Sequence, residues 1–332
     1  MGPEDLEHVL DALPRLPDER LLIGLDEPDD AAVYRLDDGQ AVAATLDFFT
    51  PLVDDPEQFG AVAAANSLSD LYAMNVTPAF ALAVLAIPAG EFPDEVVEAI
   101  YRGASDVCRE AGIVIAGGHS VDDREPKFGL VAIGLGDPDR LYRKRGGKPG
   151  DALVLGKGLG TGVITTAIKA QEARAEEIRA AVDSMRQLNR EATAALADVE
   201  VHAATDVTGF GLLGHLWELC RAGSVGARVS ANAPRLIPGA DRLAAAGHVP
   251  GGTRRNREAV EQHLDWGPEV SENRRVLLCD AQTSGGLLAA VPPGEADEVV
   301  RRWSAGGYAA ARVGRLVERG DGPAIRVEAG QQ

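Results

Sequence analysis

The stretch AAANSLSDLYAM, residues 63–74, combines a helical pattern with an amide and a carboxylate on one face. It is rich in alanine, lacks glycine and proline, and repeats apolar residues at spacings of three and four, which predicts a helix over about residues 57–75. Asn66 and Asp70 lie four residues apart and share one face with alanines. A solvated helix face is the ordinary explanation, but such a face has no need of small neighbours. We therefore expect Asp70 to face something other than water.

Strands and one further helix are predicted around this segment. The predicted strands cover residues 30–36, 41–47, 80–87, 113–120 and 128–136, and the second helix covers 93–111. The stretch RLDDGQA between the first two strands predicts a hairpin turn. Residues 136–151 are rich in glycine, proline and charge, so we place a domain boundary there and predict domains of residues 1–137 and 138–332.

The second half also mixes strands with helices. We expect helices at residues 163–171, 173–198, 210–222 and 295–307, with strands at 152–157, 201–206, 311–318 and 324–330. VLLCDAQTSGGLLAAV, residues 276–291, is interpreted as strand, turn, strand. Neither half alternates strictly between strand and helix, so the predicted fold class is α+β for both.

Composition excludes several classes of function. The formal net charge is −18, from 51 acidic and 33 basic residues, and such a field repels nucleic acids and anionic membranes. No apolar run approaches the ~20 residues of a membrane span, and GPEDLEHVL after Met1 is acidic and amphipathic, unlike a signal peptide. The three cysteines, Cys108, Cys220 and Cys279, are odd in number and widely spaced, which indicates a reducing cytoplasm and core thiols.

Carboxylates at chain turns form the strongest chemical pattern. Each has an ordinary explanation: Asp29 and Asp30 could form a turn before a strand, and Asp47 and Asp206 could cap the turn or helix after their strands. Together with Asn66 and Asp70, however, they are the hard oxygen ligands that Mg²⁺ takes. Bound metal would let a very acidic protein hold a polyphosphate.

Two glycine runs support a phosphate ligand. LGKGLGTGV, residues 155–163, follows a strand and opens a helix, so its amides and Lys157 could cradle an anion, although a flexible turn is the alternative. It matches neither the Walker nor the Rossmann glycine pattern. In AGGHS, residues 116–120, glycines allow close backbone approach while His119 and Ser120 supply polar groups, although a structural histidine is equally ordinary.

Seven longer stretches, taken in order, resemble one family. They are DDAAVY (29–34), TLDFFTPLVDDPEQFGAVAAANSLSDLYAMN (45–75), AGGHSVDDREPKFGL (116–130), KGLGTGVITTA (157–167), ATDVTGFGLLGHL (204–216), VPGGTRRN (249–256) and LLCDAQTSGGLL (277–288). They are similar to the successive signatures of selenophosphate synthetase, or selenide, water dikinase, within the superfamily of aminoimidazole ribonucleotide synthetase. The resemblance covers roughly residues 20–320.

The resemblance implies a reaction and an architecture. ATP, selenide and water would give selenophosphate, AMP and phosphate. The subunit would have two domains: the N-terminal ATP- and metal-binding domain would form a β-barrel across a homodimer, and an α+β domain would follow. The implied metal ligands are Asp30, Asp70 and Asp206, with Asn66 as a further candidate. The implied ATP-binding residues are Asp29, Asp47, Asp70, Gly118, His119 and Ser120, the last three reaching the partner's nucleotide.

One departure affects catalysis. Members of the family carry a catalytic Cys or selenocysteine, followed by a Lys, just before the segment that corresponds to GPEDLEHVL. We therefore expect no catalytic residue in this chain and place that segment upstream of Met1, so that the chain as given would bind ATP without forming selenophosphate. Two alternatives stay open: a non-catalytic ATP-binding relative, and another small-molecule kinase of the same superfamily.

Overall fold

The computed structural model describes residues 17–88 and 90–330, so the amphipathic segment expected at residues 2–10 lies outside the described residues. Its first half forms a sheet with the strand order β1-β2-β3-β6-β4-β5. The strands are β1 (Leu21–Ile23), β2 (Ala32–Arg35), β3 (Ala41–Phe49), β4 (Thr77–Ile87), β5 (Ile115–Asp122) and β6 (Lys127–Gly136). Neighbours are antiparallel except β4 and β5, which are parallel. The predicted strands of this half and its hairpin, β2 with β3, are confirmed.

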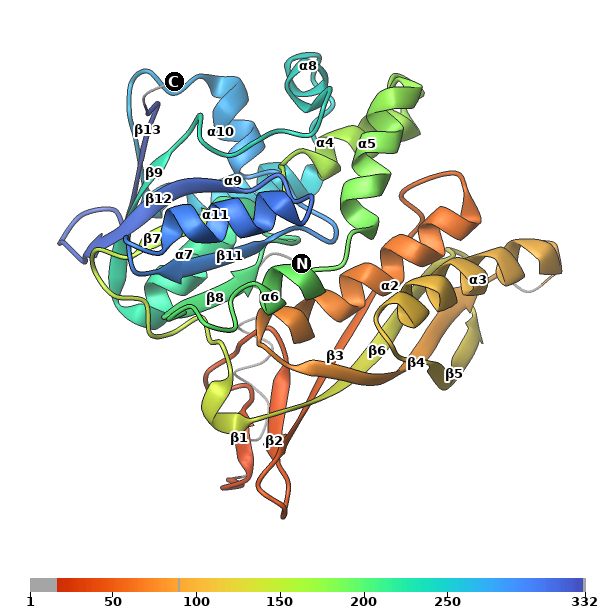
Figure 1. Ribbon diagram of the computed structural model, residues 1–332. Helices are drawn as coiled ribbons and strands as arrows, with labels where there is room; N and C mark the ends of the chain where they lie inside the picture. Colours follow the sequence, from red (N-terminus) through yellow and green to blue (C-terminus); the bar gives the residue numbers. More distant parts are fainter. Residues whose placement is uncertain (1–16, 89, 331–332) are drawn as a thin grey trace.

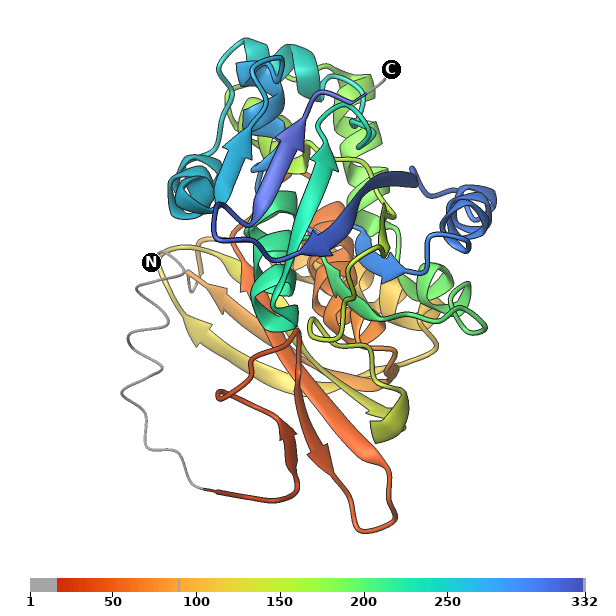
Figure 2. The ribbon, with the colours of Figure 1, turned by 90° about the vertical axis from the view of Figure 1, so that its left-hand side faces the viewer.

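Two helices, α2 (Pro56–Ala73) and α3 (Asp94–Glu110), cover one face of this sheet (Figures 1 and 2). The carboxylate of Asp55 caps α2 by accepting hydrogen bonds from the N–H groups of Glu57 and Gln58 in the first turn, where Pro56 has no N–H that would need an acceptor. The helices approach so closely that a Cβ on Gly60 would lie 1.9 Å from the carbonyl oxygen of Ile100. Both helices match their predicted ranges to within two residues.

The second half of the chain forms a sheet with the order β10-β13-β9-β12-β7-β11-β8. Its strands are β7 (Ala152–Leu155), β8 (Ala203–Asp206), β9 (Val225–Ser230), β10 (Leu264–Trp266), β11 (Leu287–Val291), β12 (Ala311–Glu318) and β13 (Ile325–Glu328). The helices are α4 (Thr161–Lys169), α5 (Ala175–Arg186), α6 (Arg190–Ala194), α7 (Gly211–Gly223), α8 (Ala240–Ala245), α9 (Gly251–Val260), α10 (Glu272–Leu278) and α11 (Ala296–Ala305). Short 3₁₀ turns occur at η1 (Pro138–Arg140) and η2 (Glu261–His263). Both halves are α+β, as predicted.

Helix α2 lies at the centre of the molecule, with the sheet on one side and the second half of the chain on the other (Figure 1). It contacts β3 and β6 of its own sheet and also α5, α6 and β8. Nearly every residue from Phe59 to Ala73 is buried, and Asp70 alone in this range is partly accessible. The alanines of this helix are therefore small because two layers pack against it, which places Asn66 and Asp70 between the two halves.

Two predictions for the second half are wrong. Residues 173–198 form α5 and α6 with a break at residues 187–189, because the carbonyl of Gln187 turns away to accept a hydrogen bond from Lys157 Nζ (2.5 Å). The apolar repeat continues across this break, so the pattern does not reveal it. Residues 276–278 form the last turn of α10 rather than a strand. A short apolar run is equally compatible with a buried helix end.

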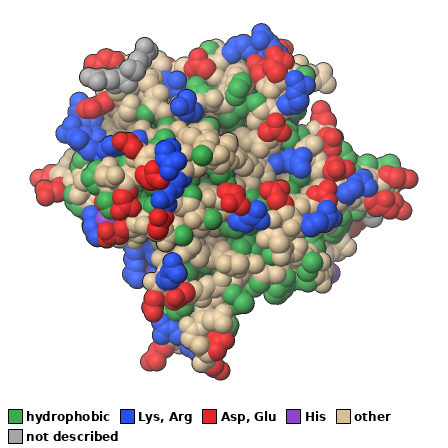
Figure 3. All heavy atoms as spheres, in the orientation of Figure 1, with side chains coloured by type: hydrophobic (Ala, Val, Ile, Leu, Met, Phe, Trp, Pro, Cys, Tyr) green, Lys and Arg blue, Asp and Glu red, His purple; other side chains and the backbone are tan. Residues whose placement is uncertain are grey.

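The outer face of the first sheet carries exposed apolar side chains. Leu46, Phe48, Phe80 and Leu135 are 38–50% exposed, and Leu46 of β3 and Leu82 of β4 both pair with Val131 of β6, so the apolar surface continues across three strands. Figure 3 shows hydrophobic side chains gathered at the lower right, where Figure 1 places β4 and β6. No described helix has the length and apolar character needed to cross a bilayer.

Candidate metal and nucleotide site

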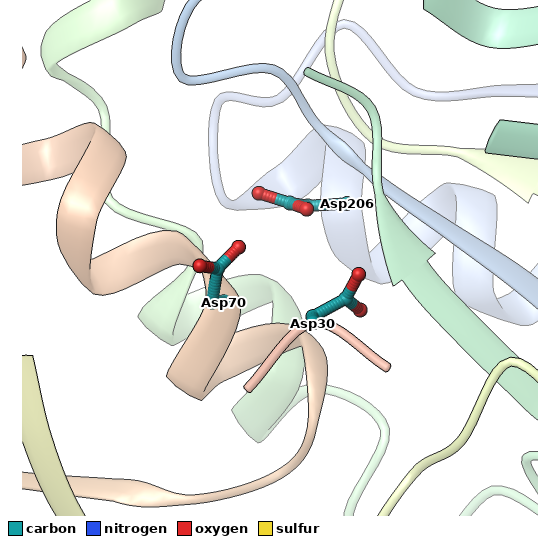
Figure 4. Close-up of side chains that lie close together, drawn as sticks. All are labelled: Asp30, Asp70 and Asp206. Atoms are coloured by element: carbon teal, nitrogen blue, oxygen red, sulfur yellow. The ribbon is translucent and has the colours of Figure 1, made fainter. Parts of the chain in front are cut away.

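Three aspartates from distant parts of the chain meet between the two halves. Asp30 lies just before β2, Asp70 lies in the last turn of α2, and Asp206 ends β8 (Figure 4). One carboxylate oxygen from each lies within 4.8 Å of the other two. Carboxylates this close repel one another unless protons or a cation intervene. The structure thus brings together the three residues that were predicted to bind metal.

Each of these carboxylates accepts a hydrogen bond from a hydroxyl group. The pairs are Thr45 Oγ1 to Asp70 Oδ2 (2.5 Å), Ser69 Oγ to Asp206 Oδ2 (2.5 Å) and Thr205 Oγ1 to Asp30 Oδ1 (2.8 Å). The other oxygen of Asp30, Oδ2, is buried and has no hydrogen-bond partner among the described residues. A buried carboxylate oxygen without a donor fits a place where a cation binds.

The electrostatics of the cluster favour the same conclusion. Burial, reinforced by the charges of Asp206 and Asp29, raises the pKa of Asp30 to about 7 although Lys144 opposes the shift. Burial and the charges of Asp206, Asp47 and Asp30 raise the pKa of Asp70 well above its ordinary value. A nearby positive charge would therefore help these carboxyl groups to be ionised at the same time. Clustered carboxylate oxygens are the ligand type that Mg²⁺ prefers, so the residues present fit that ion.

Asp47 and Asn66 lie beside the cluster and are joined to each other. Asn66 Nδ2 donates to Asp47 Oδ2 (2.9 Å), and Asn66 Oδ1 accepts from the backbone N–H of Ser284 (2.7 Å). Burial and the charge of Asp206 raise the pKa of Asp47 to about 6. Asn66 thus links Asp47 to the second half of the chain. Its predicted role as a metal ligand stays a prediction, as does nucleotide binding by Asp47.

Asp29 anchors the segment that joins the two halves. Its Oδ2 accepts hydrogen bonds from Arg143 Nε and from the backbone N–H of Lys144, both at 3.1 Å, and its Oδ1 accepts from the N–H of Asp30 (3.1 Å). The side chain of Asp29 is 4% exposed. This carboxylate holds the Asp30 loop against the linker, and its predicted contact with nucleotide stays a prediction.

The glycine run at residues 155–163 is not an open anion cradle, so that interpretation is wrong. The side-chain oxygen of Gln282 accepts hydrogen bonds from the N–H groups of Gly160 (3.0 Å) and Thr161 (3.2 Å), which occupies the start of α4. Lys157 is buried and donates to two backbone carbonyls. Burial lowers the pKa of Lys157 to about 7, although Asp206 partly opposes the shift. The run forms a turn that packs against the segment TSGG, residues 283–286.

Gly118, His119 and Ser120 lie on β5, the edge strand of the first sheet, and all three are exposed. Strands β4 and β6 separate β5 from β3. At about 4.8 Å per strand spacing, β5 lies about 14 Å from the strand that carries Asp47. The structure does not bring these residues to the aspartates of their own chain.

The three cysteines are all buried and free. Burial raises the pKa of Cys108 to about 11 and the pKa values of Cys220 and Cys279 to about 12, so none of these thiols is a ready nucleophile. Cys108 and Cys220 lie on helices, as expected, whereas Cys279 follows α10 instead of lying in a strand. Their prediction as core residues is confirmed.

Several residues of the site were not predicted. Thr45, Ser69 and Thr205 each lie within two positions of a predicted acid in the sequence, and this adjacency was the available signal. Thr45 precedes Asp47 by two residues on the same face of β3, where a strand presents both to one side. Lys144 lies in a charged linker, RKR, where the residue type carries no comparable signal.

Comparisons with known proteins agree with this architecture. Residues 28–136 match the family described as AIR synthase related protein, N-terminal domain, and residues 148–326 match its C-terminal domain. The fold and the site thus define a two-domain AIR synthase related protein.

Among curated relatives, the chain is 44% identical over 314 residues to selenide, water dikinase of Carboxydothermus hydrogenoformans, covering 95% of this chain and 91% of that protein. It is 45% identical over 319 residues to selenide, water dikinase of Pelobacter propionicus, covering 96% and 92%. The chain belongs to the selenide, water dikinase family.

Solved structures confirm the fold. The structure of tt0281 from Thermus thermophilus is similar with a TM-score of 0.74 at 22% identity, over 100% of this chain and 98% of that one. A chain of the HypE–HypF complex is similar with a TM-score of 0.74 at 17% identity, over 99% and 98%. The predicted boundary between residues 137 and 138 falls between the two family matches and stays a prediction.

Proposed function

We propose that this chain serves the ATP-dependent formation of selenophosphate, in which ATP, selenide and water give selenophosphate, AMP and phosphate. The names of its relatives support this reaction. The observation that carries the proposal is the cluster of Asp30, Asp70 and Asp206, whose ligand oxygens lie within 4.8 Å of one another. The free, buried thiols fit a reducing compartment, so we place the protein in the cytoplasm.

In this proposal the three aspartates hold Mg²⁺. When bound, the ion would neutralise the negative charge of the ATP phosphates at the transferring phosphoryl group. The hydroxyl groups of Thr45, Ser69 and Thr205 each donate to one of the three carboxylates and so help to hold these in place. Asp29 and Asp47 border the nucleotide, and Asn66 keeps Asp47 in place.

The binding part of this proposal is tested with Asp206→Asn. Calorimetry should show that the wild-type protein binds ATP in the presence of Mg²⁺ and that this variant loses at least about 100-fold in affinity, because one charged ligand of three is removed. Asp37→Asn, at a side chain 95% exposed on the surface, is the matched control and should bind as the wild type does. Unchanged ATP binding by Asp206→Asn would contradict the assigned site.

The reaction itself is tested separately. Protein produced from the natural gene, supplied with ATP, Mg²⁺ and selenide, should release AMP and phosphate with a selenophosphate signal in phosphorus NMR. Release of ADP with no selenophosphate would favour a small-molecule kinase of the same fold and contradict the proposed reaction, even if ATP binding behaves as expected.

We propose further that two copies of the chain form a homodimer through the first sheet. The support is the apolar outer face of that sheet, which includes Leu46 and Phe48, each about half exposed. Pairing would also explain how Gly118, His119 and Ser120, which lie on the edge strand away from their own cluster, reach a nucleotide: they would contact the one bound by the partner. Light scattering should give about twice 34.8 kDa, and Phe48→Glu should shift the protein toward monomer.

Mixing two inactive variants tests the shared site directly. Asp70→Asn damages the metal cluster, whereas His119→Ala damages only the residue offered to the partner. If the sites are composite, mixed dimers contain one intact site, so remixing the two variants should restore roughly a quarter of the wild-type ATP binding. If His119 serves its own subunit, each mixed dimer still has one site with an intact cluster and an altered His119, and remixing restores nothing.

A further inference from the structure

Lys144 reaches from the interdomain linker into the acidic cluster. Its Nζ lies 3.0 Å from Asp30 Oδ1 and 3.1 Å from Glu218 Oε2, and its side chain is only 12% exposed. A lysine ammonium is strongly hydrated and is rarely buried unless acids compensate for the lost water. Lys144 has two such acids, and only Asp30 belongs to the proposed metal site.

Glu218 is the second acid that holds Lys144. Glu218 lies on α7, and its Oε2 is 3.5 Å from Nδ1 of His215, one turn earlier on the same helix. His215 Nε2 in turn lies 3.3 Å from Thr208 Oγ1, just after β8. The ammonium is therefore fixed in place by the second half of the chain and is not a mobile surface charge that happens to reach Asp30.

The position of Lys144 has a consequence for metal binding. Asp30 Oδ1 already accepts a hydrogen bond from Thr205 Oγ1 and forms an ion pair with the ammonium of Lys144. Asp30 Oδ2 has no hydrogen-bond partner among the described residues. A divalent cation that binds at Oδ2 shares Asp30 with a positive charge already in place. Like charges held a few ångströms apart in a partly buried site repel strongly. The triphosphate of ATP adds negative charge that offsets this repulsion.

We propose that Lys144 is a resident counter-ion of the metal site, which keeps divalent-ion binding weak until a nucleotide arrives. This inference rests on the proposed metal site and adds a residue that sets the order of binding. The competing explanation is that Lys144 merely orients Asp30. The two explanations predict opposite changes in metal affinity. Loss of an orienting residue weakens metal binding, whereas loss of a resident cation tightens it.

The experiment measures Mn²⁺ binding to the full chain by electron paramagnetic resonance, with and without a non-hydrolysable ATP analogue. Without nucleotide, Lys144→Met should bind Mn²⁺ about tenfold more tightly than the wild type, because a neighbouring positive charge is gone. Lys144→Arg keeps the charge and should bind as the wild type does. Lys148→Met, four residues along the linker at a side chain 60% exposed, removes the same charge away from the site and should change nothing.

Glu218→Gln supplies a test with the opposite sign that does not require removal of Lys144. It removes the negative charge of the second acid that compensates the ammonium, so nucleotide-free Mn²⁺ binding should weaken several-fold. Equal or weaker binding by Lys144→Met, or tighter binding by Glu218→Gln, would overturn the inference. Wild-type protein with the ATP analogue is the positive control. If it binds no Mn²⁺, the proposed metal site is wrong, and the inference is overturned with it.

Discussion

Replacing Asp70 by asparagine is expected to stabilise the metal-free protein, although it removes one of the proposed metal ligands. The asparagine side chain keeps the shape of the aspartate and could still accept the hydrogen bond from Thr45 Oγ1, which is 2.5 Å long in the structure. The substitution removes negative charge from a buried cluster of acids. Functional residues that repel one another commonly reduce stability in this way.

The size of the effect can be worked from the spacing of the cluster. Two unit charges 4.8 Å apart, the upper limit for these oxygens, repel by about 3.5 kcal/mol at an effective dielectric constant of 20. Asp70 faces both Asp30 and Asp206, so with all three carboxylates ionised the repulsion on Asp70 would be at least about 7 kcal/mol. Protonation relieves much of this repulsion, because burial and the neighbouring acids raise the pKa of Asp70 well above its usual value. We expect a net gain of about 2 kcal/mol at pH 8.

The gain should depend on pH with a definite sign. An acid whose folded pKa is raised keeps a proton that the unfolded chain has released, so its contribution is present below about pH 4 and is lost as pH rises through the folded pKa. Asp30, whose pKa is about 7, and Asp70 both behave in this way. Wild-type stability should therefore fall relative to Asp70→Asn between pH 5 and pH 8.

The assay is urea unfolding at a fixed protein concentration with a chelator present, at pH 5 and at pH 8, followed by circular dichroism. Asp37→Asn, at an exposed position, is the control and should leave stability unchanged within about 0.5 kcal/mol. Adding Mg²⁺ in excess of the chelator, together with a non-hydrolysable ATP analogue, at pH 8 should raise the midpoint of the wild type but not that of Asp70→Asn. A variant less stable than the wild type at pH 8, or a gain equal at both pH values, would refute this reasoning.

Three further predictions concern packing and buried groups. Gly60→Ala should cost about 3 kcal/mol in thermal or urea unfolding, because its Cβ would meet the carbonyl of Ile100, whereas Gly294→Ala, in open space, should be neutral. Lys157→Met should cost about 2 kcal/mol less stability at pH 7 than at pH 9, because the pKa of Lys157 near 7 makes the wild type lose stability as pH falls toward 7. An equal loss of stability at both pH values would contradict the lowered pKa of the buried Lys157. The native cysteines should react with a thiol reagent at least about 100-fold more slowly than in urea, and a fast native phase would contradict their burial.

Local sequence pattern was enough to predict the elements in and beside the proposed metal site. The alanine-rich run around Asn66 and Asp70 identified α2, and apolar runs that end in aspartate identified β3 and β8. In each case the acid was conspicuous because its neighbours are apolar or small. A polar residue among residues that are otherwise chosen for packing is informative, since burial of an unpaired charge is costly.

The predictions that proved wrong concern features that depend on contacts between residues distant in the sequence. The break after α5 exists because Lys157, thirty residues earlier, needs the carbonyl of Gln187. The glycine run that resembled an anion cradle is filled by Gln282, more than one hundred residues later. Lys144 carries no local sign of its position. Such features are set by which segments meet, and a single sequence window does not contain that information.

The embedding of α2 between the two halves has a consequence for synthesis. Asn66 Oδ1 accepts a hydrogen bond from the backbone N–H of Ser284, which lies 218 residues later in the chain. Ser69 Oγ donates a hydrogen bond to Asp206, which lies 137 residues later. At 5–20 residues per second, the ribosome needs roughly 10–40 s to supply Ser284 after Asn66 has emerged. Once β6, which ends at Gly136, has emerged, the first sheet can pair its strands, while the polar side of α2 still has no partners from the second half of the chain. The proposed metal site is thus among the last parts of the molecule to be completed.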